Sequence, residues 1–164
     1  MRSADGIRSF HPDDLRRLDQ ILGSYVRDTS ARCAVLMDRT GRLLTTAGET
    51  AGIDGVTFAS LAAADFSASD QLAMILGEDE FTTLFHQGDR LSMYLAAVGG
   101  QAILATLFDQ RTTLGMVRLR LRAAEPQFGA LFAEIAARDA TPGAALEPDW
   151  ADEAADQVDR LFAD

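Results

Sequence analysis

The sequence predicts an α/β sandwich of the α+β class, in which one five-stranded antiparallel sheet carries helices on its faces. Five short apolar runs are separated by polar or glycine-containing turns, a pattern typical of antiparallel strands. Three longer segments repeat apolar residues at the spacing of a helix. Each has one strong apolar stripe, which favours a helix layered on a sheet over a helix bundle. The predicted order is α-β-β-α-β-β-β-α, followed by an acidic tail that contains a further amphipathic helix.

The first helix and a hairpin follow a polar arm of residues 1–11. Pro12 suits the first helical turn, and two aspartates after it favour the positive end of the helix. Apolar residues then recur at helical spacing through "HPDDLRRLDQILGSYVRDTSAR". Strands are predicted at about 33–38 and 42–47, because two apolar runs flank "DRTGR", where Gly41 can adopt a positive φ.

A second helix and a three-stranded meander come next. The helix is predicted in "VTFASLAAADFSASDQLAMILGEDE", with Thr57 as its N-cap and Gly77 as its stop signal. Its stripe of Leu61, Ala64, Ala68, Leu72, Ile75 and Leu76 is assigned to the core. Strands at about 80–87, 91–98 and 102–108 are separated by "QGD" and "GGQ".

The last helix is predicted from Thr113 to about Arg138. Two features complicate it, since "VRLRLR" alternates like a strand and Pro126 should kink or restart the helix. Residues 12–138 form the predicted domain, and residues 139–164 form an acidic linker and amphipathic tail.

Composition excludes several classes of function. The net charge of −10 argues against binding to nucleic acid or an anionic membrane. All 15 basic residues are arginine, so the chain has no lysine for a P-loop or a Schiff base. No apolar run is long enough to span a membrane, and the N-terminus does not resemble a signal peptide. The single cysteine cannot form a disulfide within the chain, so the expected location is the cytoplasm.

The residues most suited to catalysis lie in "FTTLFHQGDRLSMYL". His86, Asp89 and Arg90 surround Gly88, and a sharp reversal with polar neighbours explains them without chemistry. The other histidine, His11, lies in the N-terminal arm, so no metal site is expected. Cys33 begins an apolar strand and is interpreted as a buried, unreactive thiol. We expect no catalytic residues and no cofactor.

The second helix is the more informative segment, because its remaining face lacks the usual charges. Small side chains, a methionine and an aromatic ring are common at protein interfaces. We therefore predict partner contacts for Ala59, Ala63, Phe66, Ser67, Asp70, Gln71 and Met74. The alternative is a helix buried between the sheet and a loop. Trp150, Leu161 and Phe162 in the tail are predicted to dock on a partner, unless the tail is simply solvated.

Several segments together resemble a known family. "CAVLMDRTGRLL", "AAADFSASDQLAMILGE", "FHQGDRLSMYL" and "AILATLFDQRTTLGMVRLRLR" are similar to the Roadblock/dynein light chain superfamily, and in particular to its bacterial MglB branch. The resemblance implies a homodimer whose sheets extend across a two-fold axis, with the second helices side by side. It also implies that a small Ras-like GTPase of the MglA type sits on these helices and has its hydrolysis stimulated. Ala63, Ser67 and Gln71 occupy positions of partner contacts in that family.

The expected function is therefore that of a homodimeric GTPase-activating regulator, in a process such as motility or cell polarity. A regulator of this kind needs no catalytic residues, because a Ras-like site lacks only correct positioning of its parts. The alternative is a scaffolding adaptor, similar to a light chain, that binds its partner without changing GTP turnover.

Overall fold

The sheet forms as predicted. The computed structural model describes residues 10–140, and these contain five strands in the order β2-β1-β5-β4-β3, with every neighbouring pair antiparallel. β4 and β5 pair in continuous register, while β1 and β2 pair with a shift next to their turn. The strands are β1 (Cys33–Asp38), β2 (Leu43–Gly48), β3 (Thr83–Gln87), β4 (Ser92–Val98) and β5 (Ala102–Phe108).

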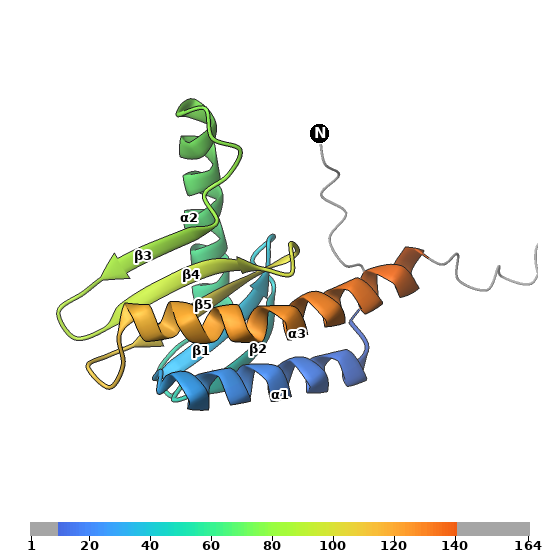
Figure 1. Cartoon of the computed structure of the whole chain (residues 1–164), viewed down its shortest axis with the longest axis horizontal. Helices are drawn as coiled ribbons and strands as arrows, with labels where there is room; N and C mark the ends of the chain where they lie inside the picture. The colour runs from blue at the N-terminus through green and yellow to red at the C-terminus, as the bar shows by residue number, and fades with distance from the viewer. Residues whose placement is uncertain (1–9, 141–164) are drawn as a thin grey trace, which may run out of the picture.

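Helices cover both faces of the sheet (Figure 1). The helices α1 (Pro12–Thr29) and α3 (Leu114–Ala140) lie side by side on one face and enclose the larger apolar core. The helix α2 (Gly55–Ile75) lies on the other face, over a smaller core. The predicted α+β class and element order are therefore confirmed, because each apolar sheet face is covered by a helix layer.

Local signals explain where the helices begin. Pro12 occupies the first turn of α1, and the Asp14 carboxylate accepts a hydrogen bond of 2.8 Å from the His11 N–H. The N-cap of α2 is Asp54, whose carboxylate accepts from the Thr57 N–H at 3.2 Å. The prediction that Thr57 is the cap is wrong by one turn, because both side chains can cap and the chain enters the helix at Asp54.

The helix α3 runs without interruption through both features that complicated its prediction. "VRLRLR" is helical, and Pro126 lies inside the helix. Two ion pairs join α3 to α1, with N–O distances of 2.6 Å between Arg17 and Glu134 and 2.7 Å between Arg138 and Asp14. The packing of α3 on the sheet and on α1 outweighs the alternating pattern and the proline.

The orientation of α2 reverses the prediction. Phe66 and Ala59 are buried against the sheet, whereas Leu61, Leu72 and Ile75 of the stripe assigned to the core are exposed. The sheet face under α2 is built from large side chains, including Val35, Met37, Leu95 and Ile103. A helix face of alanines with one phenylalanine fits closely on such a surface, because small side chains let the backbones approach.

Candidate interaction surface on α2 and β3

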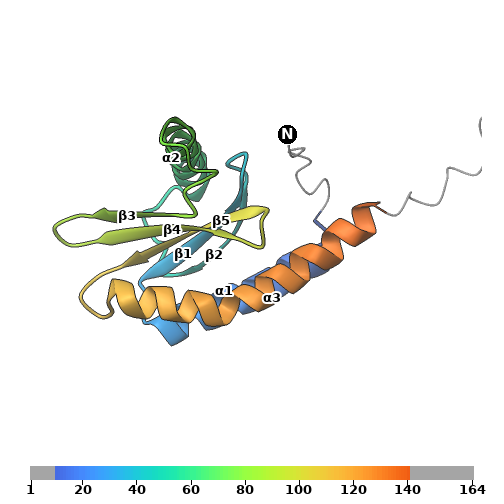
Figure 2. The same ribbon diagram turned by 45° about the horizontal axis from the view of Figure 1, so that its top comes forward.

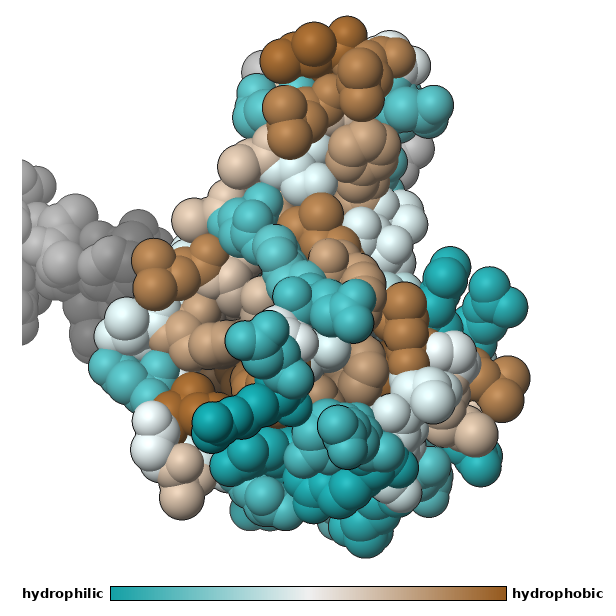
Figure 3. All heavy atoms as spheres, turned by 90° about the vertical axis from the view of Figure 1, so that its left-hand side faces the viewer, coloured by the Kyte–Doolittle hydropathy of each residue, from teal (hydrophilic) through white to brown (hydrophobic). Residues whose placement is uncertain are grey.

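An apolar surface runs along the outer side of α2. Five large apolar side chains on this helix are more than half exposed: Val56 (65%), Leu61 (66%), Leu72 (57%), Met74 (56%) and Ile75 (80%). Leu76, just after the helix, is 70% exposed. Apolar side chains gather where the end of α2 stands clear of the domain, at the top of Figure 3. A concentration of this kind is unusual for a surface that faces only water and is typical of interaction sites.

The C-terminal end of α2 projects beyond the sheet (Figures 1 and 2). Arg39, from the turn between β1 and β2, lies 3.7 Å from an Asp70 oxygen and 3.6 Å from a Glu80 oxygen. These contacts join the sheet to α2 and to the segment that follows it. Charged contacts therefore help to attach the projecting apolar end to the domain, in addition to the burial of Ala73.

The exposed part of α2 has two sides that face different surroundings. His86 on β3 lies 2.7 Å from an Asp65 oxygen, which places Asp65 on the side toward β3. Leu61 and Leu72 share that side, because they lie at helical spacings from Asp65. Asp70 lies on the opposite side of α2, where its side chain faces Arg39 in the turn between β1 and β2. We call Leu61, Asp65 and Leu72 the β3 side of α2, and Ser67, Gln71 and Met74 its β1–β2 side.

β3 leaves one edge of the sheet open. Among residues 10–140 it pairs with β4 alone, and four of its five residues are exposed. Such a strand presents unpaired N–H and C=O groups along its outer edge, so it can add a strand from another chain. This edge and the β3 side of α2 are adjacent, because the contact between His86 and Asp65 joins them.

The predicted partner residues divide into three groups. Ser67, Gln71 and Met74 are exposed, and Asp70 is partly buried beside Arg39. Trp150, Leu161 and Phe162 lie outside the described residues, and their contacts stay a prediction. Ala59, Ala63 and Phe66 are only 0%, 4% and 1% exposed, so the prediction that they meet a partner is corrected: their side chains already contact the sheet.

Sequence reasoning missed the exposed leucines and Ile75 because it used them to identify the buried face. One signal was available in the composition of α2, whose only charged residues are Asp65 and Asp70. A helix without a charged face gives no indication of which apolar side is solvated. The lack of such a face suggests that both sides become buried, one by the sheet and one by a partner.

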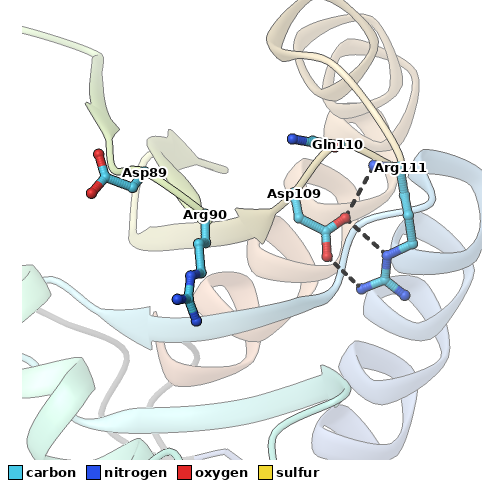
Figure 4. A pocket seen from close by; sticks show the side chains of 5 residues that line it. All are labelled: Asp89, Arg90, Asp109, Gln110 and Arg111. Atoms are coloured by element: carbon cyan, nitrogen blue, oxygen red, sulfur yellow. Dashed lines mark hydrogen bonds and ion pairs between the residues drawn. The ribbon is translucent and has the colours of Figure 1, made fainter.

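In the histidine cluster, Asp89 and Arg90 lie exposed at the turn as predicted, and only His86 departs from the prediction. His86 contacts Asp65 on α2, whereas Asp89 and Arg90 line an open hollow with Asp109, Gln110 and Arg111 (Figure 4). The Arg111 guanidinium lies 2.9 Å from an oxygen of Asp109, which also lines the hollow. It lies 2.8 Å from an oxygen of Glu49, which does not line the hollow. The Arg111 guanidinium is thus held by two carboxylates, which is a structural role.

The remaining chemical groups also have structural explanations. Cys33 is fully buried at the start of β1, and burial raises the pKa of its thiol, which disfavours the reactive thiolate. Within residues 10–140, no three side chains of the His, Cys, Asp or Glu type are grouped to hold a metal ion. No helix in the same range is long and apolar enough to cross a membrane.

Comparisons with known proteins agree with this fold. Residues 17–108 match the Roadblock/LC7 domain family. Myxococcus xanthus MglB is 33% identical with a TM-score of 0.73, and the match covers 77% of this chain and 96% of that one. The gliding protein MglB from Thermus thermophilus is 30% identical with a TM-score of 0.69, over 76% of this chain and 95% of that one.

A further MglB structure, described as having a tetrameric arrangement, is 30% identical with a TM-score of 0.71, over 77% of this chain and 95% of that one. No curated protein sequence gives a significant match. The family resemblance seen in the sequence is confirmed by the extent of these matches and by the shared fold. The chain belongs to the Roadblock/LC7 family, as an MglB-like member of it.

Proposed function

We propose that this chain is a homodimeric regulator that binds a small Ras-like GTPase of the MglA type and stimulates its GTP hydrolysis. The observation that carries the proposal is the exposed apolar surface of α2 beside the open edge of β3, in a chain of the MglB-like kind. A partner that hydrolyses GTP would place this activity in the cytoplasm.

The two sides of α2 support different contacts. On the β3 side, Leu61 and Leu72 adjoin a strand edge, so a second copy related by a two-fold axis would bury these leucines and extend the sheet together. The β1–β2 side would then remain accessible. Ser67 and Gln71 leave it fairly flat, and exposed Met74 is an adaptable apolar contact. We assign this side to the GTPase.

Stimulation of this kind requires no catalytic side chain from the regulator. A Ras-like site already holds Mg²⁺ and the phosphates, and its slow step depends on correct placement of water and of compensating charge. A regulator that binds the well-ordered conformation more tightly than the disordered one shifts the partner toward the reactive state. The helix α2 can act in this way because its own position is set by the sheet beneath it.

The test is single-turnover GTP hydrolysis by an MglA-type GTPase, measured with and without this protein. Gln71→Arg places a bulky charge on the proposed contact side, and it should abolish stimulation while dimerisation is retained. Gln127→Arg is the matched control, since Gln127 is an exposed glutamine on α3, on the opposite side of the sheet. Equal stimulation by both variants would remove the β1–β2 side of α2 from the proposal.

The adaptor alternative predicts binding without faster hydrolysis. It is distinguished by measuring affinity and single-turnover rate in the same samples, since an adaptor would saturate the GTPase and leave the rate unchanged. Ala63→Arg is unsuitable as a test of the contact predicted for Ala63, because Ala63 is 4% exposed and packs on the sheet. An arginine there would disturb the fold and would not report on a partner.

A further inference from the structure

The solvent side of α3 begins with an arginine-rich surface, which we define as Arg118, Leu119 and Arg122. All three residues are exposed, and Leu119 is 58% exposed. Arg118 and Arg122 lie one helical turn apart, so their guanidinium groups flank the same stretch of helix. In the part of the chain that the structure describes, neither arginine takes part in an ion pair.

This surface differs from most of the described domain, where seven arginines contact carboxylates, although Arg27, Arg90 and Arg120 do not. Arg17, Arg111 and Arg138 each contact an acidic side chain at less than 3 Å. Acidic residues outnumber basic ones by ten over the whole chain. An exposed leucine between two unpaired arginines therefore fits a partner that has both acidic and apolar side chains.

The chain contains such a segment immediately after α3. Residues 141–164 have seven acidic residues and a single arginine. Within this segment Trp150, Ala154, Val158, Leu161 and Phe162 recur at helical spacing, so a helix would carry an apolar stripe with carboxylates beside it. The acidic and apolar character of this segment complements that of the arginine-rich surface.

The connection is long enough for the segment to reach this surface from its own chain. The part of α3 from Arg118 to Ala140 is about 33 Å long at 1.5 Å per residue. Residues 147–163 would span about 25 Å as a helix, and the six linker residues before them reach up to about 20 Å. A reversal just after α3 therefore allows the segment to run back along the helix as far as Arg118.

We propose that residues 147–163 dock as a helix, antiparallel to α3, on the solvent side of α3 of the same chain. The end of the segment then lies over Leu119, with Asp156 and Asp159 near the two arginines. About 18 Å further along, Trp150 lies over the exposed alanines Ala130 and Ala133, where small side chains leave room for an indole. The proposal is independent of the GTPase, because it concerns the free protein.

Trp150 makes the proposal directly measurable, because it is the only tryptophan in the chain. In the full-length protein at low salt, we expect its fluorescence to be shielded from acrylamide relative to a peptide of residues 141–164. Arg118→Glu with Arg122→Glu should weaken docking roughly tenfold, because two attractions become repulsions, and quenching should rise toward that of the peptide. High salt should act in the same direction.

Arg90→Glu is the control, since Arg90 is an exposed arginine on the turn between β3 and β4. It should leave the quenching of Trp150 unchanged. Adding Asp156→Arg and Asp159→Arg to the double glutamate variant reverses the charges on both sides and should restore the shielding. This charge exchange separates docking from damage to the fold, and circular dichroism checks that each variant keeps its helices.

Four results would overturn the proposal. In the first, wild-type Trp150 is quenched as fully as the peptide, so that no docking occurs. In the second, shielding increases with protein concentration, which assigns the segment to a second copy. In the third, shielding appears only after the GTPase is added. In the fourth, Trp150 is unshielded and phosphatidylserine vesicles bind through Arg118 and Arg122, which assigns the surface to a lipid headgroup.

Discussion

Leu72 provides the sharpest test of the proposed dimer. It is 57% exposed on the β3 side of α2, so most of its side chain remains to be covered by a second copy. Leu72→Ala removes the equivalent of about three methylenes, worth about 2.4 kcal/mol if fully buried. With 57% of the side chain still to bury, the loss is about 1.4 kcal/mol per copy.

A two-fold contact contains the residue twice, so the expected loss is about 2.7 kcal/mol, or roughly a hundredfold in the dimerisation constant. Sedimentation equilibrium over a range of protein concentrations measures that constant. The stability of the monomer should hardly change, because alanine is a strong helix former and the leucine side chain is largely exposed.

Leu119→Ala is the matched control, because Leu119 is 58% exposed and also lies on a helix, on the opposite side of the sheet. It should leave the dimerisation constant unchanged. The reasoning is refuted if Leu72→Ala dimerises as tightly as the wild type, or if both variants weaken the dimer equally. The second result would mean that apolar surface in general, and not the β3 side of α2, drives the association.

Three further predictions concern the stability of the domain. Phe66→Ala should lower the free energy of unfolding in urea by about 3–5 kcal/mol, since Phe66 is 1% exposed; a loss under about 1 kcal/mol would contradict its core role. Burial raises the pKa of Tyr25, which hydrogen-bonds Thr106, to about 12, so the native state keeps this proton longer than the unfolded chain. Stability should fall as the pH rises from about 10 to 12, and Tyr25→Phe should flatten that fall in pH-dependent thermal melts. The hydrogen bond from Arg138 is the largest cause that lowers the pKa of Asp14, so the stabilisation is present above the ordinary value of 3.8 and lost as the pH falls below it. Arg138→Met should weaken this acid dependence of the melting temperature, and the hydrogen bond from His11 should keep part of it. An unchanged acid dependence would count against the pair.

Much of the fold could be predicted from local signals. The first hairpin follows from Gly41, which takes a φ of +89° and lies against the backbone of α2, where a larger residue would not fit. The end of α2 follows from Gly77 with its φ of +81°. The burial of Cys33 and the helical period of α1 were also predicted correctly. These features depend on the backbone preferences and polarity of a few neighbouring residues.

The candidate surface could be predicted only as far as the element that carries it. The scarcity of charged residues on α2 predicted an interaction helix, which stays a prediction, and Ser67, Gln71 and Met74 are exposed on it. Its larger apolar residues were assigned to the wrong side. The contact of His86 with Asp65 was also missed, because the two lie 21 positions apart and no local pattern connects them.

The sequence by itself determined the order of the elements, the positions of the turns and the absence of a lysine for P-loop or Schiff-base chemistry. Only the tertiary structure decided which side of α2 faces the sheet. Periodicity identifies apolar stripes, but it cannot rank two of them when a helix has no charged face. The large side chains of β1, β4 and β5 fill the layer under α2, so a side of alanines packs there, and the leucines and Ile75 remain exposed.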